Sequence, residues 1–569
     1  MKDDFVRLAE ENDSLFSFSY ENVEKLTEVC VCFYRKLLLR KSFSDFSERR
    51  SQLAKYVRKF HGDAGTLTPR IGEAIKNLEN DSCLLLMTAH QPNLFPYSGV
   101  LRKATLNHVL AKKLSESLEV PVVSFFGVAD QDFTDDRWVK SALLPDVDRR
   151  DGLLELRFDM PERLVLNRVA KPSRIILNNW RNEIENWIDR KLSSIKRDCA
   201  SLELQFSYNA DHTESFKNFW ALVEKAYEQA ETYSDFNAFI ISRIINDVWG
   251  YDTLFSRFSE CQKLFEREYS HLLKRFDKYS RYVKEATEFN PNSNRGVYKD
   301  ELNTLPFWYH CSCGSKAKLK VEQRDVSIIG KGSCIRCGKE YLFDFISKHE
   351  PQISGITSSI SARSLSMPLV FFHGLGICCY VGGIGGTEYL KQAQFVANHL
   401  NMIFPPVVVW RPQDVYLGVG QLDALMVYRK LSGTFDFSQY ERIKDILQRK
   451  IKEAQREIEE IEEQKKQLFA ASKRSREEQI QNLKSLSIRQ NEVRRDANFS
   501  VLVRNLRLLE NVDAVMGLHP CIVDYVVNVG LKETSEQWIA FLQSNGNLCS
   551  NIGLRSRFDR PAHNFLDEN

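Results

Sequence analysis

Two apolar segments on either side of an amphipathic one constrain the fold of this chain more than any other feature. The first, LLLMTAHQPNLFPYSG over residues 84–99, is a short apolar run ending in turn-forming residues, as expected for a buried strand that leaves a sheet. Residues 98–119 space their apolar side chains as an amphipathic helix does, and VPVVSFFGVAD over residues 120–130 favours a second strand. Strand, helix and strand within roughly fifty residues form a βαβ unit, which predicts a parallel sheet.

A second α/β segment begins at Pro368. It contains LVFFHGLGICCYVGGIGG, the helical pattern TEYLKQAQFVANHL and the strand PPVVVWRP. We therefore predict an α/β fold whose parallel-sheet core is assembled from two separated segments. The predicted division is an N-terminal helical layer (1–80), a first core segment (81–290), a zinc ribbon insertion (291–350), a second core segment (351–432), a coiled-coil hairpin (433–515) and a C-terminal packing segment with a tail (516–569).

Four cysteines between the two core segments are spaced as metal ligands. Cys311 and Cys313 form one pair, Cys334 and Cys337 form the other, and a glycine follows each pair. Zinc prefers soft ligands in a tetrahedron, and two short knuckles deliver thiolates in that way. Because the Cys-x-Cys spacing is tighter than Cys-x-x-Cys, His310 is an alternative ligand. A closed four-ligand site predicts structural rather than catalytic zinc.

The segment from Gln439 to Ala497 is dominated by Lys, Arg, Glu and Gln. Its first half places apolar residues alternately three and four positions apart, and the polar run AASKRSREE separates it from a second such half. This pattern predicts an antiparallel coiled-coil hairpin, C-terminal to the core. The apolar seam is equally compatible with pairing inside one chain and with a homodimer, and most of its charges are expected to be solvated.

Composition excludes several classes of protein. Of 569 residues, 43% are hydrophobic and 27% are charged, which is typical of a folded protein with more than one domain. The formal net charge of +3 gives no strong field, so composition does not favour a nucleic-acid or membrane partner. The acidic start MKDDFVRLAEENDS does not resemble a signal peptide. We expect a cytoplasmic protein whose thirteen cysteines stay reduced.

Polar residues follow both predicted strands of the βαβ unit. His90 and Gln91 come after the first strand, and Asp130 and Asp132 come after the second. Since the carboxyl ends of neighbouring parallel strands share one crevice, these four side chains are candidate catalytic residues. The imidazole could hold a phosphate or carboxylate, and the carboxylates could bind an amine or take its proton. The alternatives are that His90 and Gln91 satisfy loop carbonyls and that the aspartates cap a helix.

The third polar segment is the glycine loop that ends the second core segment's first strand. Its sequence, Val381 to Glu388, would let the backbone approach a ligand closely before a helix begins. Gly382, Gly383 and Glu388 of this loop, together with Asn93 of the HQPN turn, are candidate substrate-binding residues.

In this order, the three segments resemble the bacillithiol biosynthesis cysteine-adding enzyme (BshC) family. The similarity is carried by MTAHQPNLFPYSGVLRKATLNHVLAKKL, by PVVSFFGVADQDFTD and by ARSLSMPLVFFHGLGICCYVGGIGGTEYLKQAQF, and it covers roughly residues 20–290 and 351–530. The resemblance implies a Rossmann-like core followed by a coiled coil. It also implies a ligase that joins the carboxyl of L-cysteine to the amine of glucosaminyl-malate, or a related amide-forming reaction of thiol biosynthesis.

The resemblance also assigns individual positions. Gln91 matches the second Gln of the family turn, and Asp130 and Asp132 match its two Asp residues. The remaining matches are an Arg, a glycine pair and a Tyr, at Arg363, Gly382, Gly383 and Tyr389. This chain differs from the family pattern at His90, at Gly386 and in the cysteine-rich insertion. Because a carboxylate must be activated before it forms an amide, ATP or another nucleotide is an expected co-substrate.

Two other functions remain open at the sequence level. A zinc ribbon and a helical hairpin also serve as nucleic-acid or protein-binding surfaces, and lysines and arginines near both segments permit phosphate contacts. A nucleotidyl-transferring enzyme in which His90 binds phosphates is the other alternative, although the second half of a His-x-Gly-His motif is missing.

Overall fold

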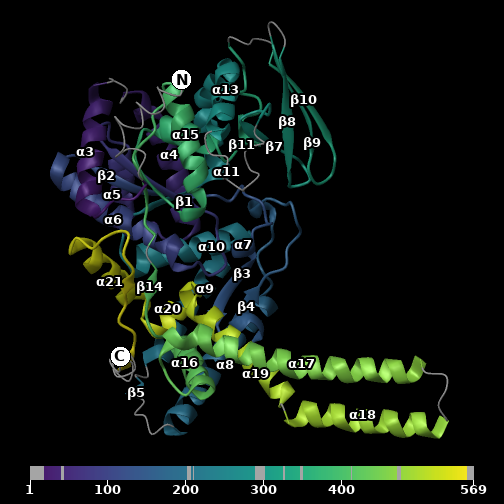
Figure 1. Ribbon diagram of the computed structural model, residues 1–569. Helices are drawn as coiled ribbons and strands as arrows, with labels where there is room; N and C mark the ends of the chain where they lie inside the picture. Colours follow the sequence, from purple (N-terminus) through teal and green to yellow (C-terminus); the bar gives the residue numbers. More distant parts are fainter. Residues whose placement is uncertain are drawn as a thin grey trace.

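A five-stranded parallel sheet forms the centre of the computed structural model, which describes residues 18–39, 44–201, 207–208, 211–288, 302–323, 327–345, 350–411, 413–470, 476–496 and 498–559 (Figure 1). Its strand order is β13-β12-β1-β2-β6, and all neighbouring strands are parallel. The strands are β1 (Leu84–His90), β2 (Val122–Val128), β6 (Leu254–Arg257), β12 (Ile377–Gly382) and β13 (Val407–Val409). The prediction of a mixed α/β fold with a parallel sheet is confirmed.

The two separated segments meet between β1 and β12. Leu85 pairs with Ile377 on one side of β1 and with Val123 of β2 on the other. From β1 the chain adds β2 and then β6 in one direction, and it later returns to add β12 and β13 in the other. The reversal creates a topological switch point between β1 and β12, and ligands bind outside the carboxyl ends of strands at such points.

Both faces of the sheet are buried, which explains why β1 reads as a continuous apolar run. Leu84 and Leu86 belong to one hydrophobic cluster, whereas Leu85 and Met87 belong to the cluster on the opposite face. The first face is covered by α3 (Val23–Leu39) and α6 (Ser98–Leu118), and the second by α4 (Ser44–Asp63), α5 (Pro69–Leu78), α14 (Ser366–Leu375) and α15 (Thr387–His399).

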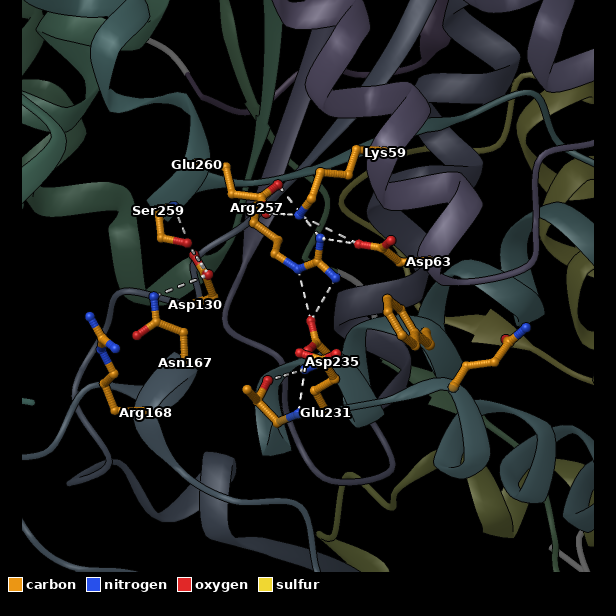
Figure 2. A pocket seen from close by; sticks show the side chains of 13 residues that line it. Lys59, Asp63, Asp130, Asn167, Arg168, Glu231, Asp235, Arg257, Ser259 and Glu260 are labelled. Carbon is orange, nitrogen blue, oxygen red and sulfur yellow. Dashed lines mark hydrogen bonds and ion pairs between the residues drawn. The ribbon is translucent and has the colours of Figure 1, made fainter.

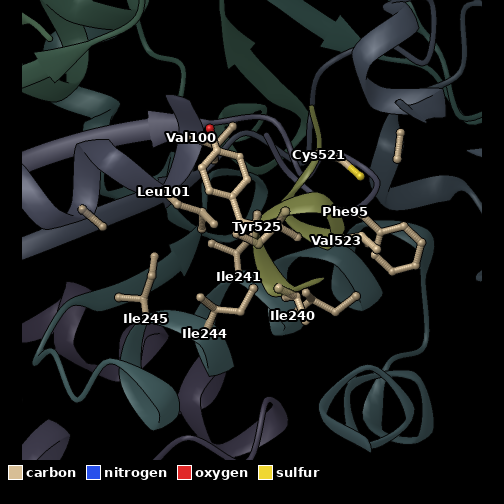
Figure 3. Close-up of a cluster of buried hydrophobic side chains, with 14 of the residues drawn as sticks. Phe95, Val100, Leu101, Ile240, Ile241, Ile244, Ile245, Cys521, Val523 and Tyr525 are labelled. Carbon is tan, nitrogen blue, oxygen red and sulfur yellow. The ribbon is translucent and has the colours of Figure 1, made fainter. Parts of the chain in front are cut away.

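The first hydrophobic cluster continues into a helical body below the sheet. Figure 3 shows Phe95, in the turn between β1 and α6, in the same group of buried side chains as Ile240 and Val523. This body is made of β3 (Ser141–Pro145), β4 (Leu153–Arg157), α8 (Arg174–Ser201), α9 (Asp211–Gln229), α10 (Tyr233–Ser242), a π-helical turn (Arg243–Val248), α16 (Val419–Ser432), α19 (Phe499–Met516), α20 (Ile522–Asn528) and α21 (Leu531–Gln543).

A second, antiparallel sheet lies at the upper right in Figure 1 and has the order β10-β9-β8-β7-β11. Its strands are β7 (Phe307–His310), β8 (Lys316–Gln323), β9 (Ile328–Cys334), β10 (Glu340–Phe345) and β11 (Ile360–Ala362). The helices α11 (Phe258–Cys261), α12 (Glu266–Lys274) and α13 (Phe276–Glu288) contribute side chains to the second hydrophobic cluster, which also contains residues of both sheets. The short helix α7 (Arg137–Lys140) belongs to the first cluster through Val139. The antiparallel sheet extends past residue 350, so it shares β11 with the range predicted as the second core segment.

Two long helices, α17 (Tyr440–Ala470) and α18 (Arg476–Asp496), lie side by side and project from the helical body (Figure 1). Ala454, Ile458 and Ile461 are buried between them. Gln490 of α18 accepts a hydrogen bond from Lys465 of α17 at 2.7 Å.

The last described strands return to earlier parts of the chain. Parallel β14 (Asp414–Val415) pairs with β15 (Ile552–Gly553), and β16 (Phe558–Asp559) pairs with β5 (Ser207–Tyr208). None of the helices in the described ranges is both long enough and apolar enough to cross a membrane.

Candidate functional site at the carboxyl edge of the sheet

The polar residues predicted after the strands lie along one edge of the parallel sheet. His90 is the last residue of β1, Asp130 comes two residues after β2, and Gly382 ends β12. Because β12, β1 and β2 are adjacent and parallel, the three segments exit at the same edge. The backbone links two of them directly, since the amide of Ala129 donates to the carbonyl oxygen of His90 at 2.9 Å.

His90 is fixed by the turn that follows it. The Asn93 side-chain amide donates from Nδ2 to the carbonyl oxygen of Trp138 at 2.9 Å, which turns its Oδ1 toward His90. His90 Nδ1 lies 2.8 Å from that Oδ1 and 3.0 Å from the carbonyl oxygen of Gln91, so we assign the proton to Nδ1. His90 Nε2 then accepts from the Tyr97 hydroxyl at 3.2 Å.

This environment determines the charge of His90. Burial, with a further contribution from the nearby Lys103 ammonium, lowers the pKa of His90 to about 3. The ring is therefore neutral at pH 7, and both of its nitrogens already have partners. It orients the Tyr97 hydroxyl and does not supply a positive charge for a phosphate or carboxylate.

Gln91 and Asp132 face each other across the β1–β2 edge. Gln91 Nε2 donates to Asp132 Oδ2 at 3.1 Å, and both side chains are partly accessible to solvent. Burial raises the pKa of Asp132, and the ammonium of Lys316 and the Gln91 hydrogen bond oppose the rise. The pair joins the exits of two adjacent strands.

Asp130 is held more tightly than Asp132 and is fully buried. Its Oδ1 accepts from the backbone amide of Ser259 at 2.9 Å, and its Oδ2 accepts from the Ser259 hydroxyl and from Asn167 Nδ2. Burial raises the pKa of Asp130 to about 6, and the two Ser259 hydrogen bonds oppose the rise. Asp130 therefore ties the end of β2 to the segment that follows β6, with both oxygens engaged.

A polar cavity of about 460 Å³ adjoins the carboxyl ends of β2 and β6. Figure 2 shows Arg257 at its centre, where it binds Asp235 at 2.8 Å and Asp63 at 3.1 Å. The Lys59 ammonium forms an ion pair with Glu260 on the same rim. Five carboxylates and three cationic side chains line the cavity, which leaves an excess of negative charge at neutral pH: Asp63, Asp130, Glu231, Asp235 and Glu260 against Lys59, Arg168 and Arg257.

Lys103 was not singled out by the sequence, yet it lies at the switch point. Its side chain is 6% exposed, and its Nζ donates to the carbonyl oxygen of Ala89 in β1 at 3.3 Å. A Cβ atom on Gly383 would lie 3.3 Å from the same Nζ. Burial lowers the pKa of Lys103 to about 7. The sequence offered one signal for this position: Lys103 falls on the apolar face of the helix predicted at residues 98–119.

The other predicted substrate-binding residues are spread more widely. Gly382 is buried at the end of β12, and Gly383 is partly exposed beside Lys103. Tyr389 lies on α15, partly buried against the second hydrophobic cluster. Arg363 follows β11 in the antiparallel sheet, where its guanidinium lies 4.4 Å from the centre of the Trp308 ring. The side chain of Glu388 lies outside the described residues.

The four cysteines predicted as ligands come together at one end of the antiparallel sheet. All four Sγ atoms lie within 4.8 Å of one another, and Cys311–Cys337 and Cys313–Cys334 are separated by 3.6 and 3.5 Å. Tetrahedral zinc with Zn–S bonds of about 2.3 Å places its sulfurs about 3.8 Å apart, so the group fits such an ion. The expected cluster is confirmed.

The alternative ligand His310 has a different partner. Its Nε2 lies 2.8 Å from the Ser361 hydroxyl, and it is not among the residues grouped around the cysteine sulfurs. Gly314 and Gly338 have φ values of +84° and +74°, which explains the glycine after each cysteine pair. The four thiols could therefore hold a metal ion such as zinc without help from a histidine.

Comparison of the sequence with protein-family models and with curated proteins finds no match.

Proposed function

We propose that this chain is an amide-forming ligase that acts on small polar substrates at the carboxyl edge of the parallel sheet. The proposed reaction joins the carboxyl of L-cysteine to the amine of an aminosugar such as glucosaminyl-malate, as in the BshC family. The observation that carries this proposal is the juxtaposition of three polar segments, far apart in sequence, at the exits of β12, β1 and β2. The strand order, with its reversal between β1 and β12, supports the further proposal that the parallel sheet is a Rossmann-like core.

The charges at the edge support this proposal. The cavity beside Asp130 has more carboxylates than cations, which favours a ligand with an amine and hydroxyl groups. At the switch point, Lys103 and the backbone of Gly383 offer donors to a carboxylate or phosphate. Amine and acyl partners would therefore approach from two ends of one edge.

Amide formation also requires a group that removes a proton from the amine. In the proposed reaction the amine nitrogen bonds to the carboxyl carbon of cysteine, previously activated by a nucleoside triphosphate, and the C–O bond to the leaving group breaks. The proton released by the nitrogen passes to a carboxylate. We assign this role to Asp132 rather than to Asp130, because both oxygens of Asp130 are already engaged in hydrogen bonds.

We assign structural roles to the other two predicted features. Four thiolates leave no open position for a reacting water, so the bound metal would be structural zinc. The α17–α18 pair is proposed to be a coiled-coil hairpin. The nucleic-acid alternative keeps some support: Lys316 is buried at 3% exposure, but Lys320, Lys331, Arg336 and Lys339 of the same sheet are exposed, so the ligand test below includes an oligonucleotide.

Ligand-dependent melting tests the proposal. L-cysteine, an aminosugar malate and ATP, singly and together, should raise the melting temperature, whereas an oligonucleotide should not. Asp132→Asn should weaken the shift caused by the amine substrate, and Asp159→Asn, at a side chain that is 85% exposed, should leave it unchanged. A shift that survives Asp132→Asn would place the amine site elsewhere.

The reaction itself is tested with the same components. Mass spectrometry should detect the cysteine conjugate when all three are incubated with the protein, and Asp132→Asn should reduce its rate by about 10²–10⁴-fold, the usual contribution of a general base. Absence of the conjugate with wild-type protein that binds both substrates would reject the proposed reaction. Measuring small thiols by mass spectrometry in cells with and without the protein provides the matching test in vivo.

A further inference from the structure

The cysteine cluster is in direct contact with a loop of the core. The backbone amide of Val165 donates to the carbonyl oxygen of Gly314, in the first knuckle, at 2.9 Å. Arg163 Nη1 donates to the carbonyl oxygen of Ile335, in the second knuckle, at 3.1 Å. A Cβ atom on Gly314 would lie only 2.8 Å from Leu164 Cδ1, so the knuckle and the loop are closely packed. We call residues 163–167 the strut loop.

The other side of the strut loop is bonded to the candidate site. The amide of Leu166 donates to the carbonyl oxygen of Asp132 at 3.0 Å, and the amide of Asn167 donates to that of Asp130 at 2.9 Å. The Asn167 side chain adds a weaker contact to Asp130 Oδ2 at 3.4 Å. Three consecutive amides of the strut loop therefore connect the first knuckle to the two predicted aspartates.

The antiparallel sheet also sends a side chain toward the same aspartates. Lys316, three residues after Cys313, is almost completely buried, and its Nζ lies 4.8 Å from the centre of the Phe133 ring. Asp132 and Asp130 are the carboxylates that attract its ammonium most strongly. A shift of the first knuckle would therefore move both the backbone and the charge around Asp132.

A metal ion would control the position of this knuckle. Cys311 and Cys313 lie more than twenty residues from Cys334 and Cys337, and one ion bonded to all four thiolates cross-links the two knuckles. Without it, four thiol groups remain packed together with only weak S–H hydrogen bonds between them. Metal binding of this kind contributes directly to the folding free energy of the segment that supplies the ligands.

We propose that metal binding by Cys311, Cys313, Cys334 and Cys337 holds the strut loop in place and so positions Asp130 and Asp132. The cysteine centre is then a positioning element of the candidate site and not an independent surface module. The proposal rests on the location assigned to the site under the proposed function, but its test needs no substrate. Failure of the ligase assignment would leave it standing.

Amide hydrogen exchange of the full chain tests this directly. Zinc-loaded protein is compared with protein from which zinc has been removed by a chelator, and with the same sample after zinc is added back. Loss of zinc should speed exchange of the amides of residues 165–167 by about tenfold or more, while the amides of β12 keep their protection. Adding zinc back should restore the slow rates.

Two variants provide matched controls. Cys337→Ser removes a ligand whose side chain is exposed, so the substitution itself deletes no buried apolar contact, and it should reproduce the effect of the chelator. Cys549→Ser removes another exposed thiol, far from the cluster in sequence, and should retain both zinc and slow exchange. Zinc loss without faster exchange at residues 165–167 would overturn the proposal. Equal loss of protection in β12 would also overturn it, because the centre would then stabilise the whole chain.

Discussion

The two sheets of this protein are stabilised in different ways. In β1 of the parallel sheet, six of seven residues are buried, and alternate side chains enter hydrophobic clusters on opposite faces. In β10 of the antiparallel sheet, buried or partly buried residues alternate with exposed ones, and Leu342 is 67% exposed. The parallel sheet is thus held by apolar burial on both faces. The antiparallel sheet has one covered face and a cysteine cluster at its end.

Removal of the metal should produce the largest difference in stability between the two sheets. Apparent zinc-binding free energies of about 10–16 kcal/mol in zinc-finger peptides are part of the folding free energy of the segment that supplies the ligands, and the antiparallel sheet supplies all four cysteines here. Chelation, or Cys334→Ser, should therefore expose residues 307–345 to limited proteolysis while the parallel sheet remains in a protected fragment. Zinc content measured before and after the change provides the control. Simultaneous cleavage of both sheets, or zinc content unchanged by Cys334→Ser, would contradict this expectation.

A pair of leucine substitutions compares the stability of the two sheets while the metal stays bound. Leu86→Ala in β1 should lower the free energy of unfolding by about 2–5 kcal/mol, because the residue is fully buried in the first hydrophobic cluster. Leu342→Ala in β10 should change it by less than about 0.5 kcal/mol, because the side chain is mostly exposed. Chemical denaturation with zinc present measures both. Equal effects would show that burial does not distinguish the two sheets.

The sequence predicted the features of both regions that depend on local patterns, and it missed those that depend on contacts between distant segments. The β1–α6–β2 unit was predictable because its apolar pattern follows the periods of strand and helix, and the cysteine cluster was predictable because metal ligands require a fixed spacing. The cavity was not, because Lys59, Asp235 and Arg257 lie on segments with no local signal and meet only through the order of the strands. The strut loop was missed for the same reason, since its hydrogen bonds join residues that are far apart in sequence.

Lys103 is an exception to apolar burial in the parallel sheet. Its pKa of about 7 lies below the unfolded value of about 10.4, so the folded state binds fewer protons than the unfolded state between these limits. The free energy of unfolding should therefore rise with pH from about 7 to about 10, and Lys103→Met should remove that contribution to the rise. At pH 7 the variant should be more stable by about 1–3 kcal/mol. Methionine has no ammonium that must be buried or deprotonated when the chain folds.

The control for Lys103→Met is Lys112→Met, at an exposed position of the same helix, which should leave the pH dependence as in the wild type. Denaturation at several pH values with zinc present measures all three proteins. A slope that is the same with and without Lys103 would mean that its amine is charged in the folded protein at these pH values, and the assignment of Lys103 as a buried donor at the switch point would need revision.

The projecting helix pair extends the comparison to a third region, where the smallest effect is expected. Gln490 is 8% exposed and links the two helices, because it accepts from Lys465 at 2.7 Å and donates to Glu462 at 3.0 Å. Gln490→Ala should cost about 1 kcal/mol, the usual net value of lost hydrogen bonds. Because the pair lies apart from both sheets, this cost should appear as faster amide exchange in α17 and α18, without a change in the main unfolding transition. Gln455→Ala, on the exposed side of α17, is the control and should leave amide exchange unaltered. A lower midpoint of the main unfolding transition for Gln490→Ala would show that the helix pair unfolds together with the sheets.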